Sequence, residues 1–542
     1  MATVADVVVS PLVQALLHKL DSSAINDFAK QWNTEKELKQ CSVVLQLIYT
    51  MASSIEDMQI RDPCLPIYLA DLRETIFRAT ATLDEFIYEM HHQRIRGKVG
   101  QFIHYSFNEN QKLRKDEIRG VIADLENELV MIQEKIESKY LNLISSDKWS
   151  PDETKRRLQI VSSLDKRSKS GSTVDDSQIF ALNGSRIIVT TRFRRVSSIM
   201  SAIETIDLEG LPYENCWELF KRKAFINDDC EAYPNLKRIG EKIVKKCKGL
   251  PLAIKTLGGL LWGESDVNKW NSILESEMWE IAGEDSILPA LRLNYYHLPA
   301  HLKLCFAYCS LFPKDSKFDK ETLVRFWMAE GFVASKQTEI MEDLGGRYFD
   351  ELLNRSFFQR YYENTFVMHD LIHDLAEFVS KDLCQRVENG KSKIISKKAC
   401  YISTVDVQFK SIEKEVDKCK GLSTLLLIKN GANENIWYIP SDLFEHKCLR
   451  VLDLGGNYSF DSLPDSIGKL KHLCLLNLNW TGIKVLPESL CNLYNLQTLM
   501  LKGCDELHDF PKDMGSLINL QHIVMDDKYI WKKFTKRGIG RL

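Results

Sequence analysis

The chain has 542 residues, of which 44% are hydrophobic and 27% charged, and its formal net charge is −3. This length predicts two to four domains, and the composition provides enough apolar side chains to build their cores. Its 72 basic residues nearly balance its 75 acidic residues, which excludes a chain-wide attraction to nucleic acid or anionic lipid.

Signals for secretion, membrane insertion and disulfide bonding are missing from the sequence. The N-terminus lacks the basic region and apolar core of a signal peptide, and no apolar run reaches the roughly 18 residues of a membrane span. The 14 cysteines are scattered and none forms a Cys-x-x-Cys pair, which favours reduced thiols over zinc or disulfide bonds. We therefore expect a cytoplasmic chain without stable membrane insertion.

The first 145 residues are dominated by seven-residue apolar repeats. Three segments that begin near Leu38, Leu65 and Ile118 place apolar residues at alternating steps of three and four, as helices packed along one stripe do. Ser10 and Pro11 predict the start of an earlier helix. We expect an antiparallel four-helix bundle over residues 1–145 and, from its Ser/Lys-rich composition, a linker over 146–183.

Five short motifs follow in a fixed order. They are GSRIIVTTR at 184–192, CWELF at 216–220, GLPLA at 249–253, CFAYCSLFP at 305–313 and MHD at 368–370. The ordered set resembles the nucleotide-binding core, called the NB-ARC module, of plant intracellular immune receptors. The resemblance implies ADP or ATP as the cofactor. It also implies that Arg192 senses a nucleotide phosphate, that Pro251 packs on adenine and that His369 holds the bound diphosphate.

The phosphate-binding loop of such a core is missing. That loop needs Gly-x-x-x-x-Gly-Lys-Ser/Thr, because backbone amides beside its glycines wrap the phosphates. The nearest match starts at Gly249, but Ile254 replaces the second glycine and Pro251 removes an amide. The strand that ends in a magnesium-binding carboxylate is also missing, since the pairs Asp175-Asp176 and Asp526-Asp527 lie in the wrong context. We therefore expect weak or lost nucleotide binding, with Arg192, Pro251 and His369 as vestigial contacts.

The surviving part of this core divides into two regions. Residues 184–285 form a partial NB-ARC module, with remnant strands at 186–191 and 205–208 and a helical domain. The family resemblance makes 286–390 a winged-helix domain. Its alternating apolar residues from 357 to 368 predict a hairpin that precedes a helix.

The winged-helix region has partial signatures of two other functions, zinc binding and DNA binding. His369 and His373 have the spacing of two zinc ligands on a helix, but Asp370 replaces the expected glutamate and no third ligand stands out. The stretch 303–320 mixes four lysines with Asp315 and Asp319 and has no basic stripe for DNA. We predict no metal, no nucleic acid and no catalytic residue, and hence no enzyme.

Leucine-rich repeats fill residues 391–542. The consensus recurs from Leu422, Leu449, Leu473, Leu496 and Leu520, at spacings that fit a 20–29-residue period, so stacked repeats should form a short parallel solenoid. No capping segment follows the last repeat, so we expect an array that is cut short. Side chains between the leucines are expected to face a protein partner: Arg450, Asp453, Asn477, Asn479, Trp480, Gln497 and Lys502.

The expected fold is multidomain and mainly α with α/β parts. The whole chain resembles the coiled-coil, NB-ARC, leucine-rich-repeat receptors of plant defence. The resemblance implies recognition of a pathogen-derived or guarded protein through the repeats and signalling through the helical bundle, here with an impaired ADP/ATP switch. Two alternatives stay open. An intact receptor supplies the missing ATPase site in trans, or the chain is a degenerate product that does not fold stably.

Overall fold

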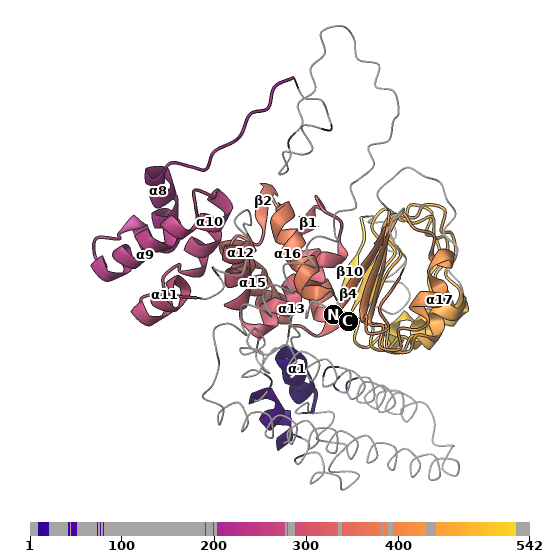
Figure 1. Cartoon of the computed structure of the whole chain (residues 1–542). Helices are drawn as coiled ribbons and strands as arrows, with labels where there is room; N and C mark the ends of the chain where they lie inside the picture. The colour runs from indigo at the N-terminus through magenta and orange to yellow at the C-terminus, as the bar shows by residue number, and fades with distance from the viewer. Residues whose placement is uncertain are drawn as a thin grey trace. The chain divides into compact units, whose positions relative to one another are not determined.

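The computed structural model describes most of the chain beyond residue 203 and part of what precedes it. The described residues are 9–20, 39, 42–43, 45–50, 52, 73, 76, 80, 190, 199, 203–276, 279, 288–333, 339–381, 383–388, 394–429 and 441–526. They belong to two compact units, one with residues 148–293 and Met1, the other with residues 2–147 and 294–542 (Figure 1). Each unit is described by itself.

The first unit is a small helical domain built around a buried tryptophan. It contains α8 (Tyr213–Ala224), η2 (Ile226–Asp228), α9 (Pro234–Lys246), α10 (Pro251–Leu260) and α11 (Val267–Leu274). Trp270 is fully buried, with its ring edge-on to Phe220 at a centroid distance of 6.0 Å. Its indole Nε1 donates to the carbonyl oxygen of Glu264 at 2.9 Å, so the one polar atom of this ring is satisfied.

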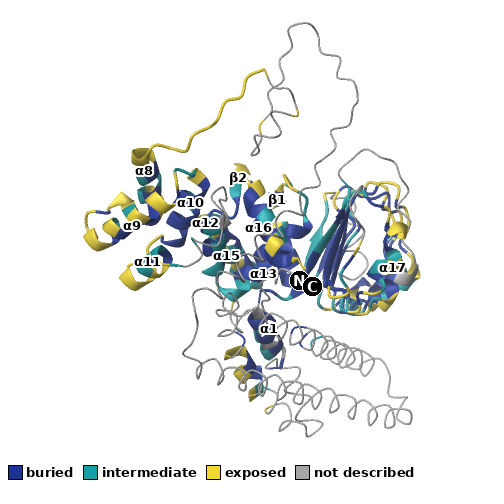
Figure 2. Ribbon diagram, viewed as in Figure 1, coloured by how far each residue is buried: buried dark blue, intermediate teal, exposed yellow. Residues whose placement is uncertain are grey.

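The strand predicted at 205–208 is not formed. Residues 203–210 carry no strand and belong to neither sheet of the described residues. Figure 2 shows this segment as exposed. A β-strand requires a neighbour for its backbone hydrogen bonds, and the alternating pattern alone does not supply one. Of the other expected remnant strand, 186–191, only Thr190 is among the described residues.

The N-terminal part of the second unit contains α1 (Ser10–Leu20). This helix begins at Ser10, one residue earlier than predicted, and it buries Val13 and Leu16. The three heptad segments lie almost entirely outside the described residues, so the four-helix bundle stays a prediction. A search of the described helices finds none with the length and apolar character needed to cross a membrane.

The winged-helix region surrounds a small antiparallel sheet. The chain passes from the first unit to the second within α12 (Leu288–Tyr296). The region continues through α13 (Ala300–Tyr308), η4 (Cys309–Leu311), β1 (Phe318–Asp319), α14 (Lys320–Glu330), α15 (Met341–Asn354), β2 (Gln359–Tyr362), β3 (Thr365–Val367) and α16 (Asp370–Ser380). The strand order is β1-β3-β2, and the predicted hairpin followed by a helix is present. Asp319 caps α14 by accepting from the Thr322 amide at 2.8 Å.

A seven-stranded parallel sheet completes the second unit. Its order follows the sequence: β4 (Cys384–Glu388), β5 (Tyr401–Val405), β6 (Thr424–Ile428), β7 (Val451–Asp453), β8 (Leu475–Asn477), β9 (Thr498–Met500) and β10 (His522–Val524). Short helices lie between the strands, namely α17 (Glu413–Val416) and the 3-10 helices η5 (Phe409–Ser411), η6 (Ser441–Glu445), η7 (Asp465–Lys469), η8 (Glu488–Asn492) and η9 (Met514–Ser516).

The repeat leucines are in register across this sheet. Leu425 pairs with Leu452, and the pairing continues through Leu476 and Leu499 to Ile523. The four leucines are fully buried in one continuous core, which agrees with the predicted repeat alignment. The sheet starts two strands before the first predicted repeat, because β4 and β5 pair with it although their sequences lack the leucine consensus.

Candidate functional site

The MHD motif places its histidine at the start of α16. His369 is the N-cap residue, and its Nδ1 accepts a hydrogen bond from the Leu371 amide at 3.2 Å. One ring nitrogen thus accepts from a backbone amide of the first helical turn. The residue is nevertheless exposed to solvent. His369 belongs to the second unit, and its contact with a nucleotide stays a prediction.

Pro251 lies in the first unit, at the first position of α10. The loop before it is fixed by the Leu211 amide, which donates to the Gly249 carbonyl oxygen at 2.8 Å. Gly249 has φ +76°, and a Cβ there would lie 3.0 Å from the Gly210 Cα, so this close approach favours glycine. Pro251 is exposed. Arg192, the third predicted nucleotide contact, lies outside the described residues.

A buried arginine organises the interior beside the MHD helix. Arg386 of β4 donates through Nη1 to the carbonyl oxygens of Ser310 at 2.6 Å and Phe312 at 3.0 Å. Its guanidinium also pairs with Glu377 of α16, and its Nε with Glu388 at 2.6 Å. One side chain thus connects the end of η4, the helix α16 and the first strand of the parallel sheet.

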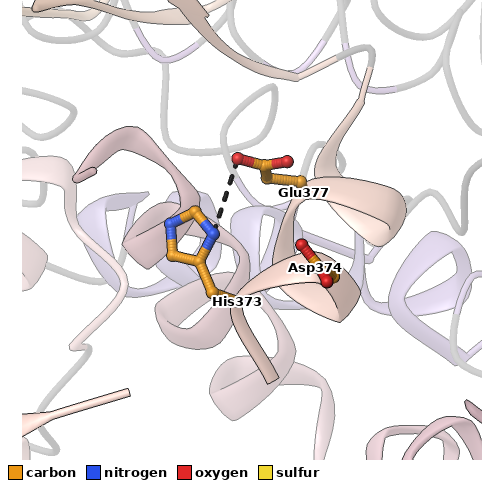
Figure 3. Close-up of side chains that lie close together, drawn as sticks. All are labelled: His373, Asp374 and Glu377. Carbon is orange, nitrogen blue, oxygen red and sulfur yellow. Dashed lines mark ion pairs between the residues drawn. The ribbon is translucent and has the colours of Figure 1, made fainter. Parts of the chain in front are cut away.

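His373 completes this network as a neutral side chain. It is buried, and its Nε2 lies 2.7 Å from the Phe312 carbonyl oxygen, so the tautomer with hydrogen on Nε2 fits the site. Figure 3 shows its Nδ1 facing Glu377, at 3.5 Å. Burial lowers the pKa of His373, and the Phe312 hydrogen bond and the nearby Glu377 oppose that shift.

His373, Asp374 and Glu377 bring three metal-ligand types within 4.8 Å of one another (Figure 3). Both carboxylates already have cationic partners, since Lys314 pairs with Asp374 and Arg386 pairs with Glu377. The Nε2 atom of His373 is directed at a carbonyl oxygen rather than at the carboxylates. These side chains therefore suit an ion-pair network better than a divalent cation. The helical His369–His373 spacing does not make a pair of ligands either, because His369 precedes the helix.

A second polar cluster joins the winged helix to the parallel sheet. Glu330, the last residue of α14, is buried and accepts from Ser423 Oγ at 2.7 Å and from Thr424 Oγ1. The Tyr308 hydroxyl lies 3.2 Å from Thr424 Oγ1. Burial raises the pKa of the Tyr308 phenol, and the Glu330 carboxylate raises it further. The two hydroxyls at the start of β6 therefore bind the carboxylate of a winged-helix residue.

The contact between the winged-helix region and the parallel sheet bears on the prediction that the side chains between the repeat leucines face a protein partner. Arg450 Nε donates to the Ala329 carbonyl oxygen at 2.9 Å, so the winged-helix region of the same chain is its partner. Further along, His522 of β10 lies 2.7 Å from Glu342 of α15. The repeat pattern identifies these residues as lying outside the repeat core, but it carries no information on what covers them.

Three other predicted recognition residues have structural roles in the loops that follow the strands. Asp453 Oδ1 accepts from the Gly455 amide at 2.9 Å, and Asn477 Oδ1 accepts from the Asn479 amide at 3.0 Å. The Asn479 side chain in turn accepts from the Lys502 amide at 2.7 Å. The polar positions of successive repeats therefore satisfy backbone amides of their own and neighbouring turns.

Trp480 and Lys502 remain exposed, and Gln497 is half-buried. Trp480 has φ +59°, an uncommon conformation for a bulky residue, and its ring covers Gly503. A Cβ at Gly503 would lie 2.1 Å from the Trp480 ring, so the two residues depend on each other. Of the predicted partner-facing residues, Trp480, Gln497 and Lys502 are those for which no structural role is described above.

Asp453 predicts a pH-dependent stability. Burial raises its pKa to about 6 from an ordinary 3.8, so the folded chain holds this proton more tightly than the unfolded chain. Stability contributed here is present below about pH 4 and is lost as the pH rises to about 6. We expect Asp453→Asn to raise the free energy of unfolding by about 1 to 2 kcal/mol near pH 7.5 and to change little near pH 4.

Denaturant unfolding at these two pH values, with hydrogen exchange of the β7 and β8 amides, measures this effect. Exposed Asp505→Asn is the matched control, and we expect it to change little at either pH. A gain for Asp453→Asn of the same size at both pH values would show that the charge of Asp453 is not its cause.

Comparison with known families covers most of the chain. Four family descriptions match: Rx N-terminal domain at residues 12–115, NB-ARC domain at 177–230, disease resistance protein winged helix domain at 311–376, and leucine-rich repeat region at 412–542. The NB-ARC match includes the exposed segment 203–210 but neither Pro251 nor His369.

Curated relatives are named as plant disease resistance proteins. An RPP13-like disease resistance protein of Arabidopsis thaliana is 40% identical over 332 residues, which are 59% of this chain and 31% of the relative. Disease resistance protein RGA2 of Solanum bulbocastanum is 35% identical over 382 residues, which are 69% of this chain and 35% of the relative. The chain thus spans about a third of the length of these relatives.

Proposed function

Because the chain belongs to the coiled-coil, NB-ARC, leucine-rich-repeat family of plant disease resistance proteins, we propose that it acts in plant defence as an intracellular receptor-like protein with an impaired nucleotide switch. Its repeats, stacked as a short solenoid, recognise a pathogen-derived or guarded protein. Its N-terminal helical bundle passes on the signal in the cytoplasm. The chain signals by binding and has no catalytic residue of its own.

The impaired switch is supported by the sequence between the bundle and residue 249. No phosphate loop is present there, and the NB-ARC match covers 54 residues at 177–230. One strand-helix-strand unit already takes about 30 residues, and a nucleotide-binding sheet needs several. His369 and Pro251 each lie at a helix start, but the phosphate loop whose backbone amides would hold the phosphates is not encoded.

Titration of the purified chain with ATP and ADP in the presence of magnesium tests this point. We expect dissociation constants weaker than about 1 mM, since side-chain contacts without the loop amides leave the phosphates largely in water. A protein with a complete phosphate loop and a measured ATP affinity serves as the positive control. A micromolar dissociation constant for either nucleotide would overturn the impaired switch.

Recognition and signalling are tested in leaves. Transient expression of the full chain is expected to alter the defence response of a plant that carries intact relatives. Deletion of residues 1–145 is expected to abolish that effect. Lys502→Glu, at an exposed repeat position, is expected to weaken partner binding without lowering the amount of protein. An unchanged response after bundle deletion would contradict signalling through the bundle.

Two alternatives make different predictions. If an intact receptor completes an ATPase site in trans, a mixture of the two proteins hydrolyses ATP faster than the receptor alone and the excess depends on Arg192. If the chain is a degenerate product, its thermal transition is broad and non-cooperative. The continuous repeat core and the buried networks around Arg386 and Glu330 favour a cooperative transition.

A further inference from the structure

Trp480 occupies a turn position that the repeats on either side of it fill with glycine. Gly456, Trp480 and Gly503 each lie seven residues after the first leucine of their repeat. All three have a left-handed backbone, with φ values of +79°, +59° and +66°. Glycine adopts this conformation freely, whereas a residue with a Cβ is strained in it. The middle repeat therefore carries a strained residue where its neighbours carry none.

The turn itself imposes this conformation. The Gly456 amide donates to the Asn479 carbonyl oxygen of the next repeat at 2.7 Å, and the Trp480 amide donates in the same way to the Lys502 carbonyl oxygen at 2.7 Å. The two turns thus make the same backbone contact. Since the turn favours glycine at this position, local folding does not explain the tryptophan.

The ring of Trp480 is supported from one side and accessible to solvent. The residue is 43% exposed, and a Cβ at Gly503 would lie 2.1 Å from its ring, so the bare Gly503 backbone forms the support. Within the described part of the chain, no acceptor is found for the indole Nε1. A tryptophan N–H ordinarily has an acceptor once it is buried, so whatever covers this ring has to supply one.

The sheet face opposite the leucine core is already covered. Val451 and Leu475 lie outside that core, yet both are fully buried. Helix α14 of the winged-helix region lies against β7 and β8, and Arg450 Nε donates to the Ala329 carbonyl oxygen beside them. A partner therefore has to approach the repeats elsewhere, and the turns that follow the strands are accessible at Trp480.

We propose that Trp480 is the residue through which the repeats hold their protein partner, and that this partner surrounds the indole with apolar side chains and offers an oxygen to its N–H. Strain that is kept at an exposed residue is typical of functional positions, and tryptophan is enriched among the residues that dominate binding energy. The inference rests on the proposed function, in which the repeats recognise a protein. It names the residue that makes the contact and the chemistry that fits it.

Two variants without the indole separate binding from stability. Trp480→Gly removes the strain together with the ring, whereas Trp480→Ala removes the ring but keeps a Cβ in the left-handed conformation. We expect the folding equilibrium constant of Trp480→Gly to be about fivefold larger than that of Trp480→Ala. Denaturant unfolding of the purified full chain measures this difference.

Binding is measured on the same proteins with a phage-displayed library of random peptides as the probe. Peptides are selected on the unmodified chain, and biolayer interferometry gives their affinities. We expect selected peptides that are rich in apolar side chains and that bind about a hundredfold more weakly to both Trp480 variants alike. Tyr458→Ala is the matched control, because Tyr458 is 62% exposed in the turn of the preceding repeat and has no positive φ. It should leave the affinity within about twofold.

Four results would overturn the inference. The selection yields no peptide, the selected peptides bind both Trp480 variants as tightly as the unmodified chain, or Tyr458→Ala weakens binding as much as the Trp480 variants do. In the fourth, Trp480→Gly binds normally and Trp480→Ala does not, because the loss would then follow the stability of the turn and not the ring.

These outcomes are separate from those of the proposed function. Peptides that depend on Trp480, together with the absence of a bundle-dependent defence response, refute only the proposed function. A bundle-dependent response that both Trp480 variants retain refutes only the role of Trp480.

Discussion

Replacement of Arg386 by alanine is expected to lower the free energy of unfolding of the second unit by about 2 to 3 kcal/mol. The guanidinium is largely buried and serves two carbonyl oxygens and two carboxylates at once. Its removal leaves Glu377 facing the neutral ring of His373 and leaves the Ser310 carbonyl oxygen without this donor. The Glu377 and Glu388 side chains are 41% and 24% exposed, so water solvates part of the charge that remains, and most of the cost comes from the carbonyl oxygen that loses a buried donor.

Denaturant unfolding, followed by hydrogen exchange in β4 and α16, measures the loss. Arg325→Ala is the matched control: Arg325 makes only an i,i+4 pair with exposed Glu321, for which about 0.5 kcal/mol is expected. Since Glu377 would no longer be held by Arg386, we also expect His373 to gain a proton more readily in the variant. A loss no larger than that of the control would show that the Arg386 network does not hold the sheet to the helix.

Glu330→Ala is expected to destabilise the contact between α14 and β6 by about 2 to 4 kcal/mol. The buried carboxylate accepts from two hydroxyls on adjacent residues, Ser423 and Thr424, and these lose their acceptor in the variant. The change also removes packing volume beside Tyr308. The leucine core of the repeats does not involve Glu330, so we expect faster exchange at β6 and β7 but little change at β9.

Glu330→Gln separates the two causes, because it keeps the size of the side chain and one acceptor oxygen. We expect it to cost about half as much as Glu330→Ala. Hydrogen exchange by mass spectrometry resolves the strands. If Glu330→Ala increased the exchange rate equally in all strands from β6 to β9, the unit would open as a whole. That result would contradict a local role of Glu330 at β6.

The repeats were the most predictable part of the fold. Leucines at fixed spacing must stack on one another to be buried, so the alignment of Leu452 with Leu476 and Leu499 follows from the sequence alone. Strands β4 and β5 escaped prediction because their inward residues, such as Val387 and Ile402, lack that spacing. They join the sheet through pairing with β6, which is a tertiary effect.

The candidate site was predictable only in part. The hairpin predicted at 357–368 implied a helix after it, which is where His369 lies, but the position of Pro251 at the start of α10 was not predicted. The junction around Arg386 and Glu330 was not foreseen. The contacting residues there are far apart in the sequence: His373 and Phe312 are separated by 61 positions, and Thr424 and Glu330 by 94. A single sequence carries no signal for such pairs.

Only three residues separate the end of α16 at Ser380 from the start of β4 at Cys384. The outermost strand of the parallel sheet is therefore an immediate continuation of the MHD helix. Exchange of repeat arrays between relatives has to respect this continuity. A chimaera joined near residue 390 takes β4 from one parent and β5 from the other, so the splice falls inside the sheet and mismatched edges meet there. A join in η6 also falls inside the sheet, between β6 and β7, but it keeps β4, β5, Glu330 and its two hydroxyl partners from a single parent. Foreign repeats should therefore be accepted better there than at a join near residue 390.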